Sequence, residues 1–263
     1  VLLMTVGTGD VFNEEATLLR PLELSIRQGE WDRVILLPSA VTQPAAESLR
    51  ERLAGKSIEL RPLPRPGAEN DADACFLHYE GVLAGLVEEG ARADGITIDF
   101  TRGTKAMSAA LVLAAVARGI PRLRYITGER DQRGMVKPGT ETISDLNALG
   151  ATTRRDLRRA AEFLELGHFA AAVRLFPSRE DPQFLLYPES LRPEIEAAVW
   201  LGRFWGAWDR FDYREAWELA GARPGVEVRE WSRFFPDARQ LDFLRGLAAG
   251  LRVDGGQRGA AVR

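Results

Sequence analysis

The fold is decided by the stretch Gly95-Ile-Thr-Ile-Asp-Phe-Thr-Arg-Gly-Thr-Lys-Ala-Met-Ser108. Residues 95–100 are mostly apolar and β-branched, which predicts a buried strand. The near-apolar run 106–117 predicts a buried helix that begins at Lys105. A strand that passes through a short loop into a helix is the repeating unit of α/β proteins.

The same alternation extends outward over residues 1–147. Strands are expected at 1–6, 33–37, 57–63, 95–100 and 122–127, and helices at 13–29, 43–54, 71–89 and 105–118. Short apolar strands that alternate with helices predict an α/β fold, a Rossmann-like and mostly parallel sheet with helices on both faces. Ligands of such sheets bind beyond the carboxyl ends of the strands.

Residues 148–263 follow a different pattern, with no convincing strand and with five of the six tryptophans. The segments 166–175 and 210–219 resemble each other, and each is expected to end one helix and begin another. The aligned pairs are Phe169 with Tyr213 and Ala172 with Ala216. We predict an all-α domain of helical hairpins with a weak internal repeat. Two unrelated amphipathic helices that match by coincidence are the alternative.

Composition narrows the classes of function. The 263 residues carry a net charge of −3, whereas a protein that binds duplex nucleic acid usually has a strongly basic face. The single cysteine, Cys75, allows no disulfide within the chain. No secretory signal is visible, and the run 106–117 is shorter than the ~20 residues that span a bilayer. We therefore expect a cytoplasmic protein that does not enter a membrane.

The loop between the strand at 95–100 and the helix at 105–118 has the composition of an anion site. The first turn of a helix offers unpaired N–H groups and partial positive charge. Two hydroxyls, two cations and a glycine converge there, and the glycine would let a ligand approach the backbone. The candidate ligand-binding residues are Thr101, Arg102, Gly103, Thr104, Lys105 and Met107. A simple helix cap flanked by charges is the weaker alternative.

A second loop, Gly7-Thr-Gly-Asp10, follows the first expected strand and should reach the same edge of the sheet. It lacks the third glycine of a dinucleotide fingerprint, and 101–105 lacks the spacing of a phosphate-binding P-loop. Thr8, Gly9 and Asp10 are therefore candidates for a second wall of the site. A tight turn from strand to helix explains them equally well.

These motifs resemble the CRISPR-associated Rossmann fold (CARF) family. The resemblance covers roughly residues 1–147, and it is carried by Val6-Gly-Thr-Gly-Asp10, by Asp99–Ser108, and by Arg124-Tyr-Ile-Thr-Gly128 with Gly139-Thr-Glu141. It implies a homodimer whose interface binds a cyclic oligoadenylate, such as the tetra- or hexa-adenylate that type III CRISPR systems use as an antiviral messenger. It also implies a C-terminal effector, which residues 148–263 do not resemble and which would lie beyond Arg263.

For such a ligand, the 2′-hydroxyls need partners like the hydroxyls of Thr8, Thr101 and Thr104. Asn70 is a candidate for pairing with an adenine edge, although a cap for the helix that follows it is the slightly preferred explanation. No cofactor and no metal are expected.

Two enzymatic alternatives use the same pocket. A slow, metal-independent ring nuclease would cleave the bound messenger, but the motif contains no obvious general base. A Rossmann-like enzyme for a small phosphorylated metabolite would need a catalytic dyad, and none is visible. His78 and His168 are expected to be structural, since Arg159 lies nine residues before His168 and ribonucleases of the HEPN type have a shorter spacing. No catalytic residue is assigned.

Overall fold

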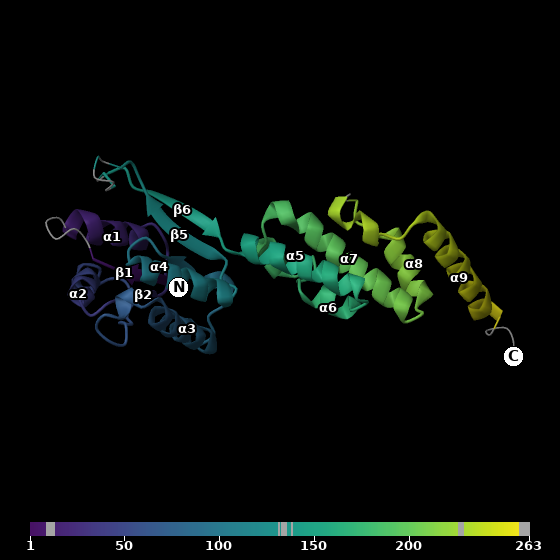
Figure 1. The fold of residues 1–263 in the computed structure, drawn as a ribbon, viewed down its shortest axis with the longest axis horizontal. Coiled ribbons are helices and arrows are strands. Elements are labelled where there is room, and N and C mark those ends of the chain that lie inside the picture. Colours follow the sequence, from purple (N-terminus) through teal and green to yellow (C-terminus); the bar gives the residue numbers. More distant parts are fainter. Residues whose placement is uncertain (9–13, 131, 133–135, 138, 226–228, 258–263) are drawn as a thin grey trace. The chain divides into compact units, whose positions relative to one another are not determined.

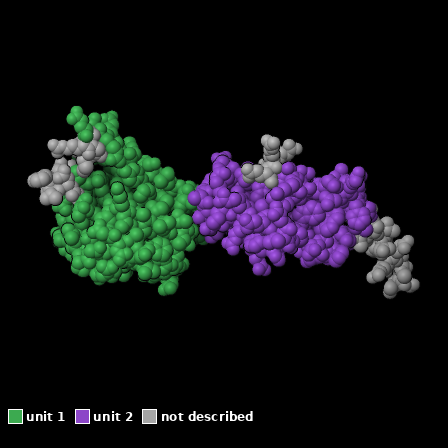
Figure 2. All heavy atoms as spheres, viewed as in Figure 1, with its two compact units in different colours: residues 1–149 green, residues 150–263 purple. Residues whose placement is uncertain are grey.

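The computed structural model describes residues 1–8, 14–130, 132, 136–137, 139–225 and 229–257. The chain divides into two compact units, residues 1–149 and 150–263 (Figure 2). Among the described residues, no helix combines the length and the apolar character that crossing a bilayer requires.

Unit 1 is built on a six-stranded sheet with the order β3-β2-β1-β4-β5-β6 (Figure 1). The strands are β1 (Leu2–Val6), β2 (Val34–Pro38), β3 (Ile58–Leu60), β4 (Thr97–Asp99), β5 (Arg122–Thr127) and β6 (Thr142–Asn147). The first five are parallel, and β6 runs antiparallel to β5. The predicted Rossmann-like sheet is confirmed, and its strand order is that of dinucleotide-binding folds.

Helices cover both faces of the sheet. One face carries α1 (Arg20–Arg27) and α2 (Gln43–Arg52), and the other carries α3 (Ala72–Glu88) and α4 (Lys105–Ala117). Short helical segments precede α1, α3 and β4, namely η1 (Glu15–Leu19), η2 (Ala68–Asn70) and η3 (Ala93–Gly95). Alternate residues of β1 serve the two layers, since Leu2 and Met4 pack toward α1 and α2 while Leu3 packs toward α3 and α4. All of β1 is buried, which explains its continuous apolar sequence.

Strand β6 is absent from the sequence prediction. It lies at the edge of the sheet, and five of its six residues are exposed. Even Leu146 is half exposed. A strand with no buried face has no apolar alternation, so its sequence gives no strand signal.

Unit 2 is helical in its described part, as predicted. Its helices are α5 (Leu149–Glu165), α6 (Phe169–Arg174), α7 (Arg192–Asp209), α8 (Tyr213–Gly221) and α9 (Ala238–Gln257), with 3-10 segments η4 (Pro182–Leu186), η5 (Glu189–Leu191) and η6 (Arg229–Phe234). Aromatic side chains fill its core around α7, where the rings of Trp200 and Phe204 stack at 5.2 Å. The indole N–H of Trp200 donates to the carbonyl of Leu219 at 2.9 Å and so joins α7 to α8.

The predicted repeat is present as two turns of the same geometry. Gly167, between α5 and α6, has φ 74°, and Phe211, at the aligned position between α7 and α8, has φ 61°. In both turns the next amide donates to the carbonyl five residues earlier, at 2.8 Å for His168 and 2.9 Å for Asp212. Ala172 and Ala216 are both fully buried. The two hairpins therefore share backbone conformation as well as sequence.

Phe211 is a strained position, because a left-handed conformation costs a residue with a Cβ about 1–2 kcal/mol. Its side chain is also 76% exposed. We expect Phe211→Gly to raise the free energy of unfolding by about 0.5–1 kcal/mol, since the flexibility of glycine in the unfolded chain offsets part of the gain. Urea denaturation measures this, and Gly167→Ala at the aligned position should have the opposite sign. A loss of stability in Phe211→Gly would show that the ring contributes more than the strain costs.

Candidate functional site

The centre of the sheet is where the strand order reverses. From β1 the chain leads to α1 on one face, and from the adjacent β4 it leads to α4 on the opposite face. Ligands of open α/β sheets bind in the crevice that such a reversal leaves at the carboxyl ends. Gly7 and Thr8, the described part of the first predicted loop, and the second predicted loop, which begins at Thr101, lie at this point.

The two loops touch through their glycines. A Cβ built on Gly7 would lie 2.6 Å from the Cα of Gly103, and one built on Gly103 would lie 2.9 Å from the hydroxyl of Thr5. The approach of a ligand to the backbone of Gly103 stays a prediction. The missing Cβ of Gly103 makes room for the protein itself, because β1 and its loop pack directly against it.

Thr104 caps helix α4 and ties it to a third loop. Its hydroxyl oxygen accepts a hydrogen bond from the amide of Met107 at 3.2 Å, and its hydroxyl donates to the carbonyl of Glu69 in η2. The side chain of Met107 is fully buried in the core under α4. The residue thus contributes its amide to the cap, and its side chain supports the site from below.

Thr101 fixes the other end of the loop. Its amide donates to the carboxylate of Asp99 at 2.9 Å, and its hydroxyl oxygen accepts from the amide of Ile126 in β5 at 2.8 Å. The hydroxyls of Thr101 and Thr104, which the sequence assigns to the ligand, are both bonded to the protein. These hydrogen bonds set the shape of the loop, and contact of either hydroxyl with a ligand stays a prediction.

Asp99, at the end of β4, is buried beneath the loop. Its second carboxylate oxygen accepts from the hydroxyl of Ser25 in α1 at 2.5 Å. Burial raises the pKa of Asp99, while the hydrogen bonds from Ser25 and Thr101 act against that rise. The sequence pattern assigned Asp99 no role of its own, although the residue begins the motif.

Two cations remain at this turn. Arg102 is half-buried, and its Nε is shielded from solvent with no hydrogen-bond partner among the described residues. Burial lowers the pKa of Arg102, and the nearby carboxylates of Asp99 and Glu141 oppose that effect. Lys105, at the first position of α4, is exposed and makes no ion pair within the described part of the chain. An anion bound at this turn would satisfy both side chains.

The structure describes only two of the four remaining candidate residues, Thr8 and Asn70. Thr8 is exposed next to the contact between Gly7 and Gly103, while Gly9 and Asp10 lie outside the described residues. Asn70 is exposed and is not the cap of α3. That role belongs to Asp71, whose carboxylate accepts from the amide of Ala74 at 3.0 Å. The preferred explanation for Asn70 is therefore wrong, and the residue is exposed beside the Glu69 anchor.

Glu69 is a neighbour of the site that the sequence pattern did not reveal. Its carbonyl holds Thr104, and its carboxylate oxygen Oε2 is buried without a hydrogen-bond partner in the described structure. No sequence motif around Glu69 indicates this contact, because Glu69 and Thr104 are 35 residues apart in the chain.

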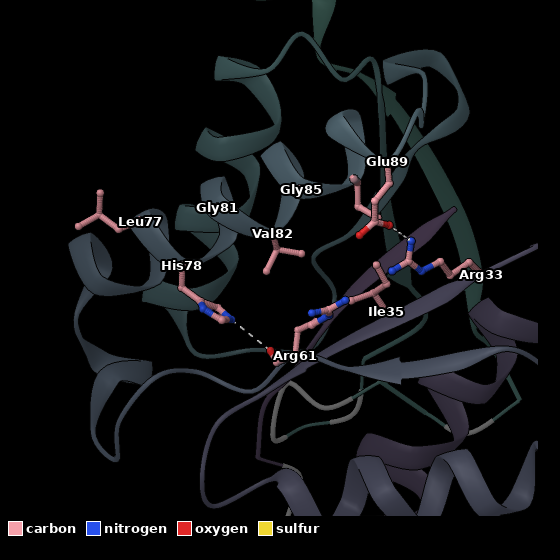
Figure 3. A pocket seen from close by; sticks show the side chains of 10 residues that line it. Arg33, Ile35, Arg61, Leu77, His78, Gly81, Val82, Gly85 and Glu89 are labelled. Carbon is pink, nitrogen blue, oxygen red and sulfur yellow. Dashed lines mark hydrogen bonds and ion pairs between the residues drawn. The ribbon is translucent and has the colours of Figure 1, made fainter.

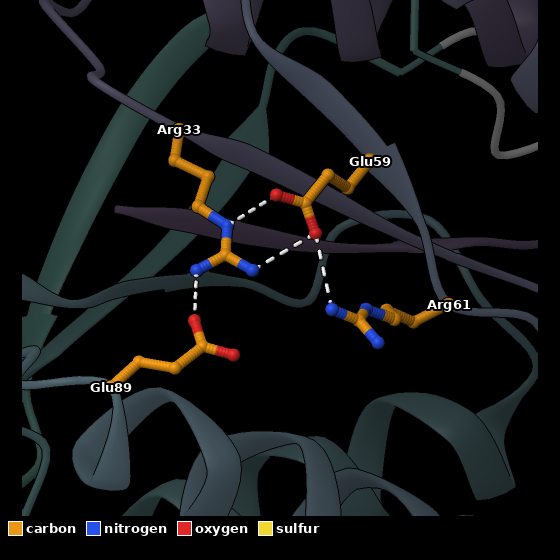
Figure 4. A network of polar contacts seen from close by, with 4 residues as sticks. All are labelled: Arg33, Glu59, Arg61 and Glu89. Carbon is orange, nitrogen blue, oxygen red and sulfur yellow. Dashed lines mark hydrogen bonds and ion pairs between the residues drawn. The ribbon is translucent and has the colours of Figure 1, made fainter.

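Unit 1 also has a cavity of about 390 Å³ beside α3, and none of the predicted site residues lines it (Figure 3). Its charged side chains pair with one another (Figure 4). Arg33 donates to both carboxylate oxygens of Glu59, at 2.5 and 2.9 Å, and pairs with Glu89, while Arg61 reaches Glu59 at 3.2 Å. Because these charges already compensate each other, the network is best explained as a link between β3 and α3.

This network predicts a pH dependence of stability. The Arg33 guanidinium lowers the pKa of Glu59 in the folded chain, so the interaction stabilises the fold above the unfolded pKa of Glu59 and is lost as the pH falls through the lowered value. We expect Arg33→Gln to cost up to about 1 kcal/mol at neutral pH, because the pair is partly exposed. Urea denaturation near neutral pH and near pH 3 should show that this cost shrinks in acid.

Arg50→Gln is the control for this experiment, since Arg50 is exposed and no ion pair of the described residues includes it. Its effect should be small at both pH values. A cost of Arg33→Gln that stayed constant with pH would show that the carboxylates are not the source.

The histidines lie outside the site, and within the described residues no group of three or more His, Cys, Asp or Glu side chains could hold a metal ion. The ring of His78 contacts the backbone carbonyl of Arg61 at 3.1 Å, and the ring of His168 packs edge-on against Phe163.

Comparison with known proteins gives matches among solved structures. No protein-family model and no curated protein matches the chain. The solved structures include Enterococcus italicus Csm6 bound to cyclic hexa-2′-fluoro-hexa-dAMP, with 16% identity and a TM-score of 0.49, over 83% of this chain and 59% of that one. They also include Sulfobacillus thermosulfidooxidans Can2 in complex with cyclic tetra-adenylate, with 12% identity and a TM-score of 0.36, over 80% and 65%. Protein VC1899 from Vibrio cholerae matches with 11% identity and a TM-score of 0.39, over 65% and 48%. The chain therefore spans less than two thirds of the length of each of these proteins.

Proposed function

We propose that the chain is a sensor that binds a cyclic oligoadenylate through the loop 101–105 and that regulates an effector. The observation that carries this proposal is Arg102. The Nε of this half-buried guanidinium is shielded from solvent without a hydrogen-bond partner among the described residues, which costs free energy, and a phosphate bound at the start of α4 would offset that cost. Lys105 adds a second unpaired charge to the same turn.

The ligand class follows from the resemblance of the motifs to the CARF family, and cyclic adenylates are the ligands in the Csm6 and Can2 structures. The site geometry is compatible with that class. Exposed Thr8 and Asn70 lie on loops that contact the cationic turn through Gly7 and through Glu69. They provide a hydroxyl and an amide for the sugar and base edges of a nucleotide.

The proposal includes a homodimer, and the surface of α4 supports it. The helix exposes Ala109, Leu113 and Ala117 in a row that begins at Lys105, and Leu113 is 59% exposed. An apolar stripe of this kind is typical of an interface. If two copies pack along it about a two-fold axis parallel to the helix, both Lys105 side chains come to the same end of the interface, which suits a ring of phosphates.

We expect Leu113→Glu to dissociate this dimer, because two carboxylates would then face each other across an apolar contact. Sedimentation velocity, with and without cyclic hexa-adenylate, measures the change. Leu77→Glu is the matched control, since Leu77 is 70% exposed on α3 and is not part of the stripe. A chain that sediments as a monomer in all conditions, ligand included, would refute the proposed dimer.

One incubation distinguishes the sensor from its enzymatic alternatives. The chain is mixed with cyclic tetra- or hexa-adenylate, and the mixture is chromatographed over hours. Recovery of an intact, protein-bound ring supports a sensor, whereas linear or shortened adenylates indicate a ring nuclease. Absence of binding to either ring would favour an enzyme for a small phosphorylated metabolite.

A further inference from the structure

Unit 2 has a cavity of about 370 Å³ between α5, the start of α7 and η6. Its lining residues are Arg154, Leu157, Arg158, Ala161, Glu194, Trp231 and Arg233. Leu157 and Trp231 are buried, so they form an apolar floor, while the charged side chains come from three separate elements. The cavity lies wholly within unit 2, so a ligand bound in it is independent of the function proposed for unit 1.

Two of the three arginines of this cavity have no ion-pair partner among the described residues. Arg154 and Arg158 are exposed side chains one turn apart on α5, and no hydrogen bond or ion pair joins either of them to another described residue. Like charges four residues apart destabilise a helix. Arg233 differs, because it pairs with Glu165 and its guanidinium lies 4.7 Å from the centre of the Phe234 ring. Two exposed arginines on one helix face are thus available to an anionic ligand.

Glu194 narrows the class of ligand. This carboxylate lies half-buried in the first turn of α7 and makes no hydrogen bond or ion pair within the described residues. An ionised carboxylate only accepts hydrogen bonds, so the cavity offers cations for an anion and an acceptor for a donor group. A phosphate ion or an acidic peptide side chain would use the arginines and repel Glu194. A ribonucleotide has both parts, a phosphate and a 2′-hydroxyl.

We propose that this cavity binds single-stranded RNA. Successive phosphates contact Arg154 and Arg158, a ribose 2′-hydroxyl donates to Glu194, and the apolar floor takes the sugar or a base edge. A single strand fits better than a duplex, because the arginines lie along one side of a small concave site rather than on a broad basic face.

Fluorescence anisotropy tests the proposal with the full chain and a labelled RNA oligonucleotide of about ten residues. We expect the double variant Arg154→Gln/Arg158→Gln to bind about tenfold more weakly or worse. Its slope of log affinity against log salt should fall by roughly 1.4, that is about 0.7 for each lost phosphate contact on a single strand.

The matched control is Arg155→Gln/Arg159→Gln. It removes the same charge from the same helix at the same spacing, but neither residue lines the cavity. Arg155 pairs with Asp156 at 3.1 Å, and Arg159 lies over the Phe163 ring. Equal losses in the two double variants would overturn the site, because they would indicate attraction to the whole helix. Arg154→Lys/Arg158→Lys keeps the charge and should retain most of the binding. Retained binding would show that the two positions tolerate substitution, so that the loss in the glutamine variant comes from the missing charge.

Glu194→Ala tests the choice of RNA. The wild-type chain should bind RNA more tightly than DNA of the same sequence, and the variant should bring the ratio of the two affinities near one. Equal binding of RNA and DNA by the wild type, or a ratio that the variant leaves unchanged, would overturn the role of Glu194. Full displacement of the labelled strand by equimolar AMP would show that a free nucleotide is the ligand, and this would overturn the assignment to a strand.

Discussion

Replacing Arg102 by methionine is expected to abolish binding of cyclic oligoadenylate while leaving the fold as stable as before or more so. The Nε of Arg102 is buried with no hydrogen-bond partner among the described residues, so its replacement removes a desolvation cost without breaking a hydrogen bond. With ligand, each charged hydrogen bond contributes about 1.5–3 kcal/mol, and a two-fold site loses it twice. The expected loss of affinity is therefore about 100-fold or more.

Calorimetry for binding and urea denaturation for stability measure the two effects on the same variant. Arg118→Met is the matched control at the other end of α4, where the arginine pairs with Glu80. It should lower stability slightly and leave binding unchanged. If Arg102→Met instead unfolded the chain, or bound the ring normally, Arg102 would be a structural residue and the site would be misassigned.

Gly7→Ala is expected to be among the most damaging single changes in unit 1. Its new Cβ would lie 2.6 to 2.9 Å from backbone atoms of Gly103, and neither loop can relieve that overlap by rotating a side chain. Overpacking of this kind costs about 1–3 kcal/mol. Because the displaced loop carries Arg102, ligand binding should fall together with stability.

Gly81→Ala provides the contrast. A Cβ at this position in α3 meets nothing within 4 Å, so the change should stabilise the helix by roughly 0.5–1 kcal/mol. The two variants should thus shift the urea midpoint in opposite directions. Equal and small shifts would mean that the contact between the loops at Gly7 and Gly103 yields without cost.

The strand, loop and helix at the centre of the sheet could be predicted because the sequence patterns that indicate them are local. Residues 95–117 contain a buried strand, a capping threonine and an apolar helix in sequence, and the structure has β4 and α4 there. The hairpin turns at Gly167 and Phe211 were also recognisable from the residues around them. The left-handed conformation of Phe211 was not, because an aromatic residue is not expected to adopt it.

What the sequence could not provide are the contacts between loops that are distant in the chain. Gly103 looked like an opening for a ligand because Thr5 and Gly7, its actual neighbours, lie almost 100 residues away. The hydroxyls of Thr101 and Thr104 looked available for the same reason, since their partners Ile126 and Glu69 belong to other strands and loops. Residue type indicates where the candidate site lies, whereas tertiary contacts decide which of its groups would be free to meet a ligand.

The most direct test of the proposed sensor is isothermal titration calorimetry of the full chain with cyclic tetra- and hexa-adenylate, with linear hexa-adenylate for comparison. We expect saturable binding of one of the two rings at one ring per two chains, more tightly than the linear form, and loss of that binding in Arg102→Met. Absence of binding to both rings, or binding that Arg102→Met leaves intact, would contradict the proposed sensor.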